Sequence, residues 1–259
     1  MNKTLVLGDL HGRTIWKDII EKEDPDKIIF LGDYVSTHDP NISSDQQIEQ
    51  LYSILSYKDE NPDKVILLRG NHDEQFLGAT WHNNPDNLFQ EIAEPYYYTK
   101  GWSGFDRKVF QYMSTRDVTN WFLNNTQWIY IDEDLKTIFS HAGISIEWLR
   151  QYIQPCIVMT ELDMSEESLR AINMIGPCEI FGFTPSKFSD YCGESPTQSC
   201  TWIRPWTLQY YIIEGYKQVV GHTPQDKVTE LYPNLWCCDA LENKSYLVIE
   251  DGQFISKIL

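Results

Sequence analysis

The chain has no long hydrophobic run and few basic residues. Among its 259 residues, no apolar stretch approaches the roughly 20 residues that a membrane-spanning helix needs. Lysine and arginine number 21 against 38 aspartate and glutamate residues, so the net charge is −17. Because binding to duplex nucleic acid depends on basic side chains that neutralise phosphates, this charge argues against a duplex partner. We therefore expect a soluble protein with neither a membrane nor a duplex nucleic acid as its partner.

The chain also lacks C-x-x-C pairs and internal repeats, and we expect no secretory signal. Its six cysteines show no metal-binding or disulfide pattern, so we interpret them as free thiols. The start, Met1 to Thr4, leads directly into an apolar segment, which predicts a cytoplasmic location. The length suits a single domain over residues 1–259.

Three short apolar segments, each followed by glycine and polar residues, dominate the first third of the chain. They are predicted as strands over Thr4–Leu7, Lys27–Leu31 and Val65–Leu68. Helical spacing between them predicts helices from Arg13 to Glu23 and from Ser44 to about residue 60. Strands that alternate with helices are typical of a mostly parallel sheet, whose ligand sites lie at the carboxyl ends of the strands.

The second of these helices has its own start signal and apolar face. Ser44 with Gln47 three residues later predicts a capping box. The spacing i, i+3, i+4, i+7 predicts that the buried face consists of Ile48, Leu51, Tyr52 and Leu55.

The middle of the chain is rich in aromatic residues with helical spacing in parts. We predict a mostly helical insertion over about residues 74–125. Residues 128–131 and 137–139 then predict a β-hairpin, and residues 216–220 predict a further strand. The C-terminal part has the pattern of short strands.

Six side chains at or just past the ends of apolar runs are candidate metal ligands. Each has glycine within three residues, which permits tight turns and close backbone approach. Mixed carboxylate, imidazole and amide donors suit manganese, iron or zinc better than calcium or magnesium. Two such ions can clamp a phosphate and lower the pKa of a shared water. The candidates are Asp9, His11, Asp33, Asn71, His141 and His222.

Five ordered motifs containing these residues resemble those of the calcineurin-like metallophosphoesterases. They are Gly8-Asp9-Leu10-His11-Gly12, Gly32-Asp33-Tyr34-Val35, Arg69-Gly70-Asn71-His72-Asp73, His141-Ala142-Gly143 and Gly221-His222-Thr223. Their form is most similar to the phosphoprotein phosphatase branch, which includes serine/threonine phosphatases and symmetrical diadenosine tetraphosphatases. The resemblance implies an α/β fold of two packed mixed β-sheets flanked by helices, an αββα sandwich.

The resemblance also implies a dinuclear metal site. Asp33 would bridge two divalent ions, for which manganese is the first choice and iron or zinc the alternatives. The first ion would be held by Asp9, His11 and Asp33, and the second by Asp33, Asn71, His141 and His222.

Further roles carry over to residues beside the ligands. His72 would be the general acid that protonates the leaving oxygen. Arg69 and Arg204 would bind phosphate oxygens, since a guanidinium matches them bidentately; Arg69 could instead pin its turn by hydrogen bonds. Asp73 and Asp239 would support the site from behind the ligands.

One motif departs from the family pattern G-D-x-V-D-R-G. Ser36 stands where the family has the aspartate that orients the catalytic histidine, and Thr37 where it has a phosphate-binding arginine. Asp39 or Asp73 could orient His72 instead, and His38 could contact phosphate. We therefore expect an altered substrate preference or weaker activity on simple phosphomonoesters.

The sequence thus predicts a metal-dependent phosphatase that hydrolyses phosphate monoesters of a protein or a small compound. A metal-bridging hydroxide would attack in line, without a covalent phosphoenzyme. The alternative is a nucleotide pyrophosphohydrolase or phosphodiesterase similar to diadenosine tetraphosphatases. A non-catalytic scaffold on the same fold is a third hypothesis. The natural substrate, the resident metals and the oligomeric state stay open.

Overall fold

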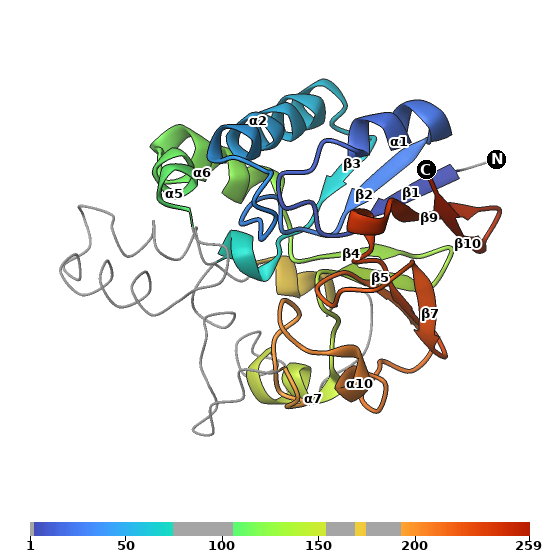
Figure 1. Cartoon of the computed structure of the whole chain (residues 1–259). Coiled ribbons are helices and arrows are strands. Elements are labelled where there is room, and N and C mark those ends of the chain that lie inside the picture. Colours follow the sequence, from blue (N-terminus) through green and yellow to red (C-terminus); the bar gives the residue numbers. More distant parts are fainter. Residues whose placement is uncertain (1–2, 75–105, 154–168, 175–192) are drawn as a thin grey trace, which may run out of the picture.

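The chain folds into two β-sheets packed face to face, with helices on the outside (Figure 1). The structure, a computed structural model, describes residues 3–74, 106–153, 169–174 and 193–259. The first sheet has the strand order β10-β9-β1-β2-β3. Its members are β1 (Lys3–Leu7), β2 (Lys27–Phe30), β3 (Val65–Leu67), β9 (Ser245–Glu250) and β10 (Gln253–Ile258).

Each sheet contains three neighbouring parallel strands and two antiparallel ones. In the first sheet β1, β2 and β3 are parallel, while β9 and β10 add antiparallel pairs. The second sheet has the order β4-β5-β6-β8-β7, in which β5, β6 and β8 are parallel. Its members are β4 (Ile129–Asp132), β5 (Thr137–Ser140), β6 (Lys217–Val220), β7 (Thr229–Tyr232) and β8 (Leu235–Cys237). The predicted hairpin is confirmed as the antiparallel pair β4–β5.

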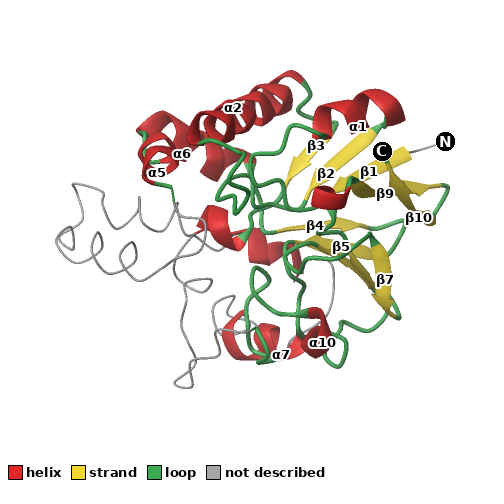
Figure 2. Cartoon of the chain, viewed as in Figure 1, coloured by secondary structure: helices red, strands yellow, loops and turns green. Residues whose placement is uncertain are grey.

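Helices cover the outer faces of both sheets (Figure 2). Those on the first sheet are α1 (Trp16–Glu23), α2 (Ser44–Glu60), α5 (Arg107–Met113) and α6 (Arg116–Asn125). The second sheet is covered by α7 (Ile146–Trp148), the π-helical turn Leu149–Ile153, the 3₁₀ turn Ala171–Met174 and α10 (Pro205–Leu208). A further 3₁₀ turn, Leu241–Asn243, links β8 to β9. The predicted architecture of two mixed sheets with helices outside is confirmed.

Strands β1 and β2 are buried on both faces, which explains their continuous apolar sequence. Successive side chains of a strand point to opposite faces. Leu5 and Leu7 accordingly join the core beneath the helices, while Val6 joins the core between the two sheets. Ile28 and Ile29 alternate in the same way.

The predicted insertion over residues 74–125 is described only in part. Helices α5 and α6 belong to it, and Val109 and Phe122 pack into the core beneath α1 and α2. Residues 75–105 lie outside the described part of the chain, so the insertion as a whole stays a prediction.

Helix α2 differs from its prediction at both the cap and the buried face. Its N-cap is Ser43, whose hydroxyl accepts the backbone N–H of Gln46, so the predicted capping box of Ser44 and Gln47 is wrong. The buried stripe runs through residues 47, 50, 51, 54 and 55. Tyr52 lies about 100° around the helix from Leu51 and falls outside this stripe, with 62% of its surface exposed.

Two smaller predictions concern cysteines and membranes. Cys200, Cys237 and Cys238 are free, as predicted, and they are buried; the other three cysteines lie outside the described residues. None of the helices in the described ranges combines the length and apolarity needed to cross a bilayer.

The buried face of α2 predicts that substitutions of the neighbouring residues Leu51 and Tyr52 differ in their effect on stability. Leu51→Ala removes a fully buried side chain and should lower the free energy of unfolding by about 2–5 kcal/mol. Tyr52→Ala should change it by no more than about 0.5 kcal/mol. Urea unfolding of both variants measures the difference, and equal losses would contradict the buried face described above.

Candidate metal centre

The six predicted ligands lie together at one edge of the two sheets. Each follows the carboxyl end of a strand: β1, β2, β3, β5 or β6. Three of them, His11, Asp33 and His222, have φ angles of 47°, 52° and 62°, in the left-handed region that non-glycine residues rarely adopt. Such backbone strain concentrates at functional sites.

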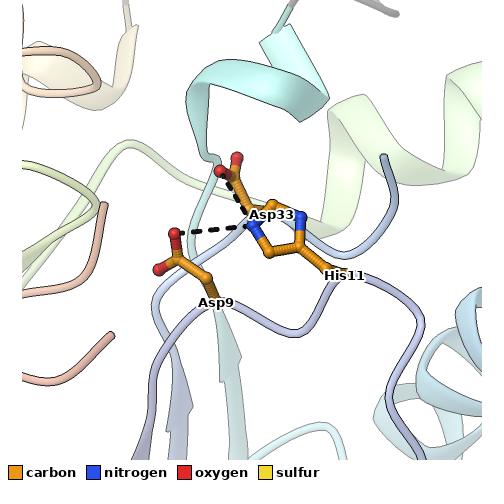
Figure 3. Close-up of side chains that lie close together, drawn as sticks. All are labelled: Asp9, His11 and Asp33. Carbon is orange, nitrogen blue, oxygen red and sulfur yellow. Dashed lines mark ion pairs between the residues drawn. The ribbon is translucent and has the colours of Figure 1, made fainter. Parts of the chain in front are cut away.

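Asp9, His11 and Asp33 form the first group (Figure 3). Nε2 of His11 lies 3.9 Å from a carboxylate oxygen of Asp9 and 3.9 Å from one of Asp33. One donor atom from each residue lies within 4.8 Å of the other two. Two buried carboxylates and an imidazole at this spacing are a donor set for a divalent transition metal.

Asn71, His141 and His222 form the second group. The side-chain oxygen of Asn71 lies 2.9 Å from Nε2 of His141 and 3.0 Å from Nδ1 of His222. Nε2 of His141 is also 3.4 Å from Oδ2 of Asp33. Asp33 therefore adjoins both groups, as the predicted bridging role requires.

Backbone carbonyls fix the tautomers of the three histidines. Nδ1 of His11 lies 2.9 Å from the carbonyl oxygen of Val35, and Nδ1 of His141 lies 2.8 Å from that of Leu31. In His222 it is Nε2 that meets a carbonyl, that of Trp202, at 3.1 Å. A carbonyl can only accept, so each of these nitrogens carries a proton. In the neutral ring the other nitrogen then presents a lone pair to the group of ligands.

The buried site carries more negative charge than its surroundings stabilise. Burial and the neighbouring Asp239 raise the pKa of Asp9 well above its usual value. Burial likewise raises the pKa of Asp239 to about 6. Burial disfavours a charged His141, but the carboxylates of Asp33 and Asp9 outweigh it and raise the pKa of that imidazole to about 10. Without a metal the site therefore retains a proton on His141.

His72 lies beside the first group. Its backbone N–H donates to Oδ1 of Asp33 at 2.9 Å, and its Nε2 is 4.0 Å from Oδ2 of the same carboxylate. Its ring meets the ring of His11 edge to face, with centroids 5.3 Å apart. Burial lowers its pKa, and the imidazoles of His141 and His38 lower it further against the attraction of Asp33.

Asp73 ties two strand ends together rather than orienting His72. One oxygen accepts the backbone N–H groups of Asp33 and Gly70, both at 2.8 Å, and the other accepts that of Tyr34 at 3.1 Å. A Cβ at Gly70 would lie 2.0 Å from Oδ1 of Asp33, so only glycine permits this approach. Asp39, the other proposed substitute, accepts its hydrogen bonds from Asn41.

Gln47, which was predicted to cap a helix, instead holds the loop of Ser36 and Thr37, where the motif departs from the family pattern. Oε1 of Gln47 accepts the backbone N–H of Ser36 at 2.8 Å and that of Thr37 at 3.4 Å. Ser36 is fully buried, and its hydroxyl has no hydrogen-bond partner among the described residues. The spacing of Gln47 in the sequence suggested a helix cap, and no sequence signal pointed to this loop.

The two predicted phosphate-binding arginines have structural contacts. Arg69 donates to the hydroxyl of Thr126 and to the carbonyls of Leu123 and Thr126 at 2.7–2.9 Å, and its guanidinium lies 4.7 Å from the centre of the Trp128 ring. The structure thus favours the alternative in which Arg69 pins its turn. Arg204 donates to the carbonyl of His222 at 2.8 Å and to the hydroxyl of Thr223, so it holds the loop that carries His222.

A cleft of about 670 Å³ adjoins the first group of ligands. His11 and Asp239 line it on the side of the metal centre. Its other charged or ionisable lining residues are Arg13, His38, Asp39, Asp226 and Glu242. A substrate could reach the first group through this opening.

Comparisons with known proteins agree with the geometry. A stretch of 122 residues is 29% identical to the catalytic subunit of serine/threonine-protein phosphatase 4 from Eremothecium gossypii. It covers 44% of this chain and 34% of that protein, so the chain matches about a third of the relative's length.

Solved structures show the same fold at low identity. A cold-active protein-tyrosine phosphatase of a psychrophilic Shewanella species aligns with all of this chain and 78% of its own, with a TM-score of 0.54 and 17% identity. A serine/threonine phosphatase from Saccharomyces cerevisiae aligns with 99% of this chain and 79% of its own, with a TM-score of 0.54 and 13% identity. The family model described as calcineurin-like phosphoesterase matches residues 3–226. The chain therefore belongs to the calcineurin-like phosphoesterase family.

Proposed function

We propose that this protein is a metal-dependent phosphatase that hydrolyses phosphate monoesters with two divalent metal ions. The observation that carries the proposal is the set of three histidines whose outer nitrogens are held by backbone carbonyls. Their inner nitrogens all face the buried oxygens of Asp9, Asp33 or Asn71. Membership of a phosphoesterase family supports the same reaction class.

The donor chemistry of the site fits the implied metals. Its buried carboxylates raise the pKa of His141, which supports a site that favours positive charge. Manganese is our first choice and iron or zinc the alternatives, because the donors mix oxygen and imidazole nitrogen. The first ion would be held by Asp9, His11 and Asp33, and the second by Asp33, Asn71, His141 and His222.

When bound, such ions supply positive charge to phosphate oxygens and lower the pKa of a water molecule. The chain's own residues supply the rest. His72, beside Asp33, would hold the proton that passes to the leaving oxygen. Its lowered pKa makes the protonated ring a stronger acid. Arg204 stays a proposed phosphate ligand. Its hydrogen bond to the backbone of His222 places its guanidinium beside a proposed metal ligand.

The charge of the cleft favours a monoester over a polyphosphate. Asp39, Asp226, Asp239 and Glu242 all line it. A substrate with several phosphates would have to place negative charge against these carboxylates, which repel it. A compound with one phosphate can direct that group to the metals and leave a neutral or cationic remainder in the cleft.

We expect the protein to hydrolyse p-nitrophenyl phosphate in the presence of Mn²⁺, and to hydrolyse its bis-ester and diadenosine tetraphosphate more slowly. Initial rates on the three substrates measure this order. Chelation of the metal should abolish all three rates. Faster hydrolysis of diadenosine tetraphosphate would replace the proposal with the pyrophosphohydrolase alternative. No hydrolysis of any substrate would favour a non-catalytic scaffold.

His72→Asn should lower kcat by about 10²- to 10⁴-fold, because it removes the proton donor to the leaving oxygen. Mn²⁺ binding should stay within about threefold of wild type, since His72 is not among the proposed ligands. Steady-state kinetics and calorimetric titration measure the two effects. An unchanged kcat would exclude His72 as the acid.

Metal binding should release protons. At pH 7 the imidazole of His141 is protonated in the metal-free site, and a ligand nitrogen must lose that proton. We expect a net release of at least about one proton per chain, because Asp9, whose pKa is also raised, can add to the proton from His141. Titration of Mn²⁺ in two buffers of different ionisation enthalpy measures the release. A binding heat that is independent of the buffer would contradict the charged state of His141.

A further inference from the structure

Arg13 is the only arginine or lysine among the described residues that line the cleft beside the metal centre. It follows His11, a first-group ligand that lines the same cleft, by two positions. Its side chain is 19% exposed and lines the cleft.

The guanidinium of Arg13 is weakly engaged within the described residues. Its Nη1 lies 3.4 Å from the carbonyl oxygen of Leu10, a long hydrogen bond. Its Nη2 lies 3.7 Å from a carboxylate oxygen of Glu242, whose side chain is 80% exposed. An ion pair with so exposed a partner contributes little. Arg69, by contrast, makes three hydrogen bonds of 2.9 Å or less.

The positive charge of Arg13 acts on an ionisable group that lines the cleft. It lowers the pKa of Asp39, although the hydrogen bonds from Asn41 lower that pKa more. Ser36 and Thr37 are both neutral, and the hydroxyl of Thr37 accepts the backbone N–H of Asp39. Arg13 is therefore the described cation best placed to meet an anion that enters through the cleft.

We propose that Arg13 binds the substrate's phosphate from the cleft side of the metal centre, in place of the family arginine that this chain replaces with Thr37. A guanidinium can bind two phosphate oxygens with its parallel N–H groups, which an ammonium cannot do. Glu242 competes with the phosphate for the same guanidinium. This inference rests on the proposed phosphatase function and adds a residue that determines substrate affinity.

The test compares Arg13→Gln, Arg13→Lys and Glu242→Gln, with Arg116→Gln as the matched control. Arg116 is an exposed residue of α6, and its substitution removes the same charge outside the cleft. Arg13→Gln should raise KM for p-nitrophenyl phosphate about 10- to 100-fold while kcat stays within about threefold. Arg13→Lys should show an intermediate KM. Glu242→Gln should lower KM about two- to threefold, and Arg116→Gln should leave it unchanged.

Binding of inorganic phosphate to the Mn²⁺-loaded protein provides a second measurement that needs no turnover. Calorimetry should show a Kd for phosphate about 10- to 100-fold higher in Arg13→Gln than in wild type, with unchanged Mn²⁺ affinity. If wild type hydrolyses nothing yet binds phosphate through Arg13, the proposed function fails and this inference stands. The inference is overturned if wild type binds no phosphate, if Arg13→Gln changes neither KM nor phosphate Kd, or if it loses Mn²⁺.

Discussion

The site depends on three imidazoles held by backbone carbonyls. Leu31, Val35 and Trp202 each direct a carbonyl oxygen at the outer nitrogen of a histidine. A side-chain partner could rotate away or change its own protonation, whereas a backbone carbonyl is held by the fold and can only accept. Each ring is thus held in one orientation, with its outer nitrogen protonated, before any metal arrives. Preorganisation of this kind is what a metal site needs from the atoms behind its ligands.

The same arrangement makes the metal-free protein electrostatically unfavourable. Asp9 and Asp33 are almost fully buried, and Asp239 lies close enough to raise the pKa of Asp9. Asp73 adds another buried carboxylate, whose three backbone N–H partners bind the loops after β2 and β3 to each other. The proton kept by His141 relieves part of this charge. A chain that concentrates carboxylates and strained backbone at one edge of its sheets is organised for a cation there.

Much of the fold and of the site follows from local sequence. The apolar runs before Asp9, Asp33 and Asn71 are strands because they are buried on both faces, and the carboxyl ends of parallel strands meet at one edge. What the sequence leaves open or misplaces is the directions of side chains. Arg69 lies beside the ligands in sequence, but its guanidinium is directed to the C-terminal end of α6, a contact between residues 57 positions apart. Gln47 has the spacing of a helix cap, yet it accepts hydrogen bonds from a loop 10 or 11 residues earlier. Such choices depend on the packed structure, which short-range spacing does not encode.

The central claim is that two groups of ligands joined by Asp33 form a site for two metal ions. The most direct test is the number of Mn²⁺ ions bound per chain, measured by calorimetric titration and by elemental analysis of the equilibrated protein. We predict two ions for wild type, one for Asn71→Ala, and weakened binding of both for Asp33→Asn. A wild-type chain that binds no Mn²⁺, or an Asp33→Asn variant that still binds two ions with unchanged affinity, would contradict the account.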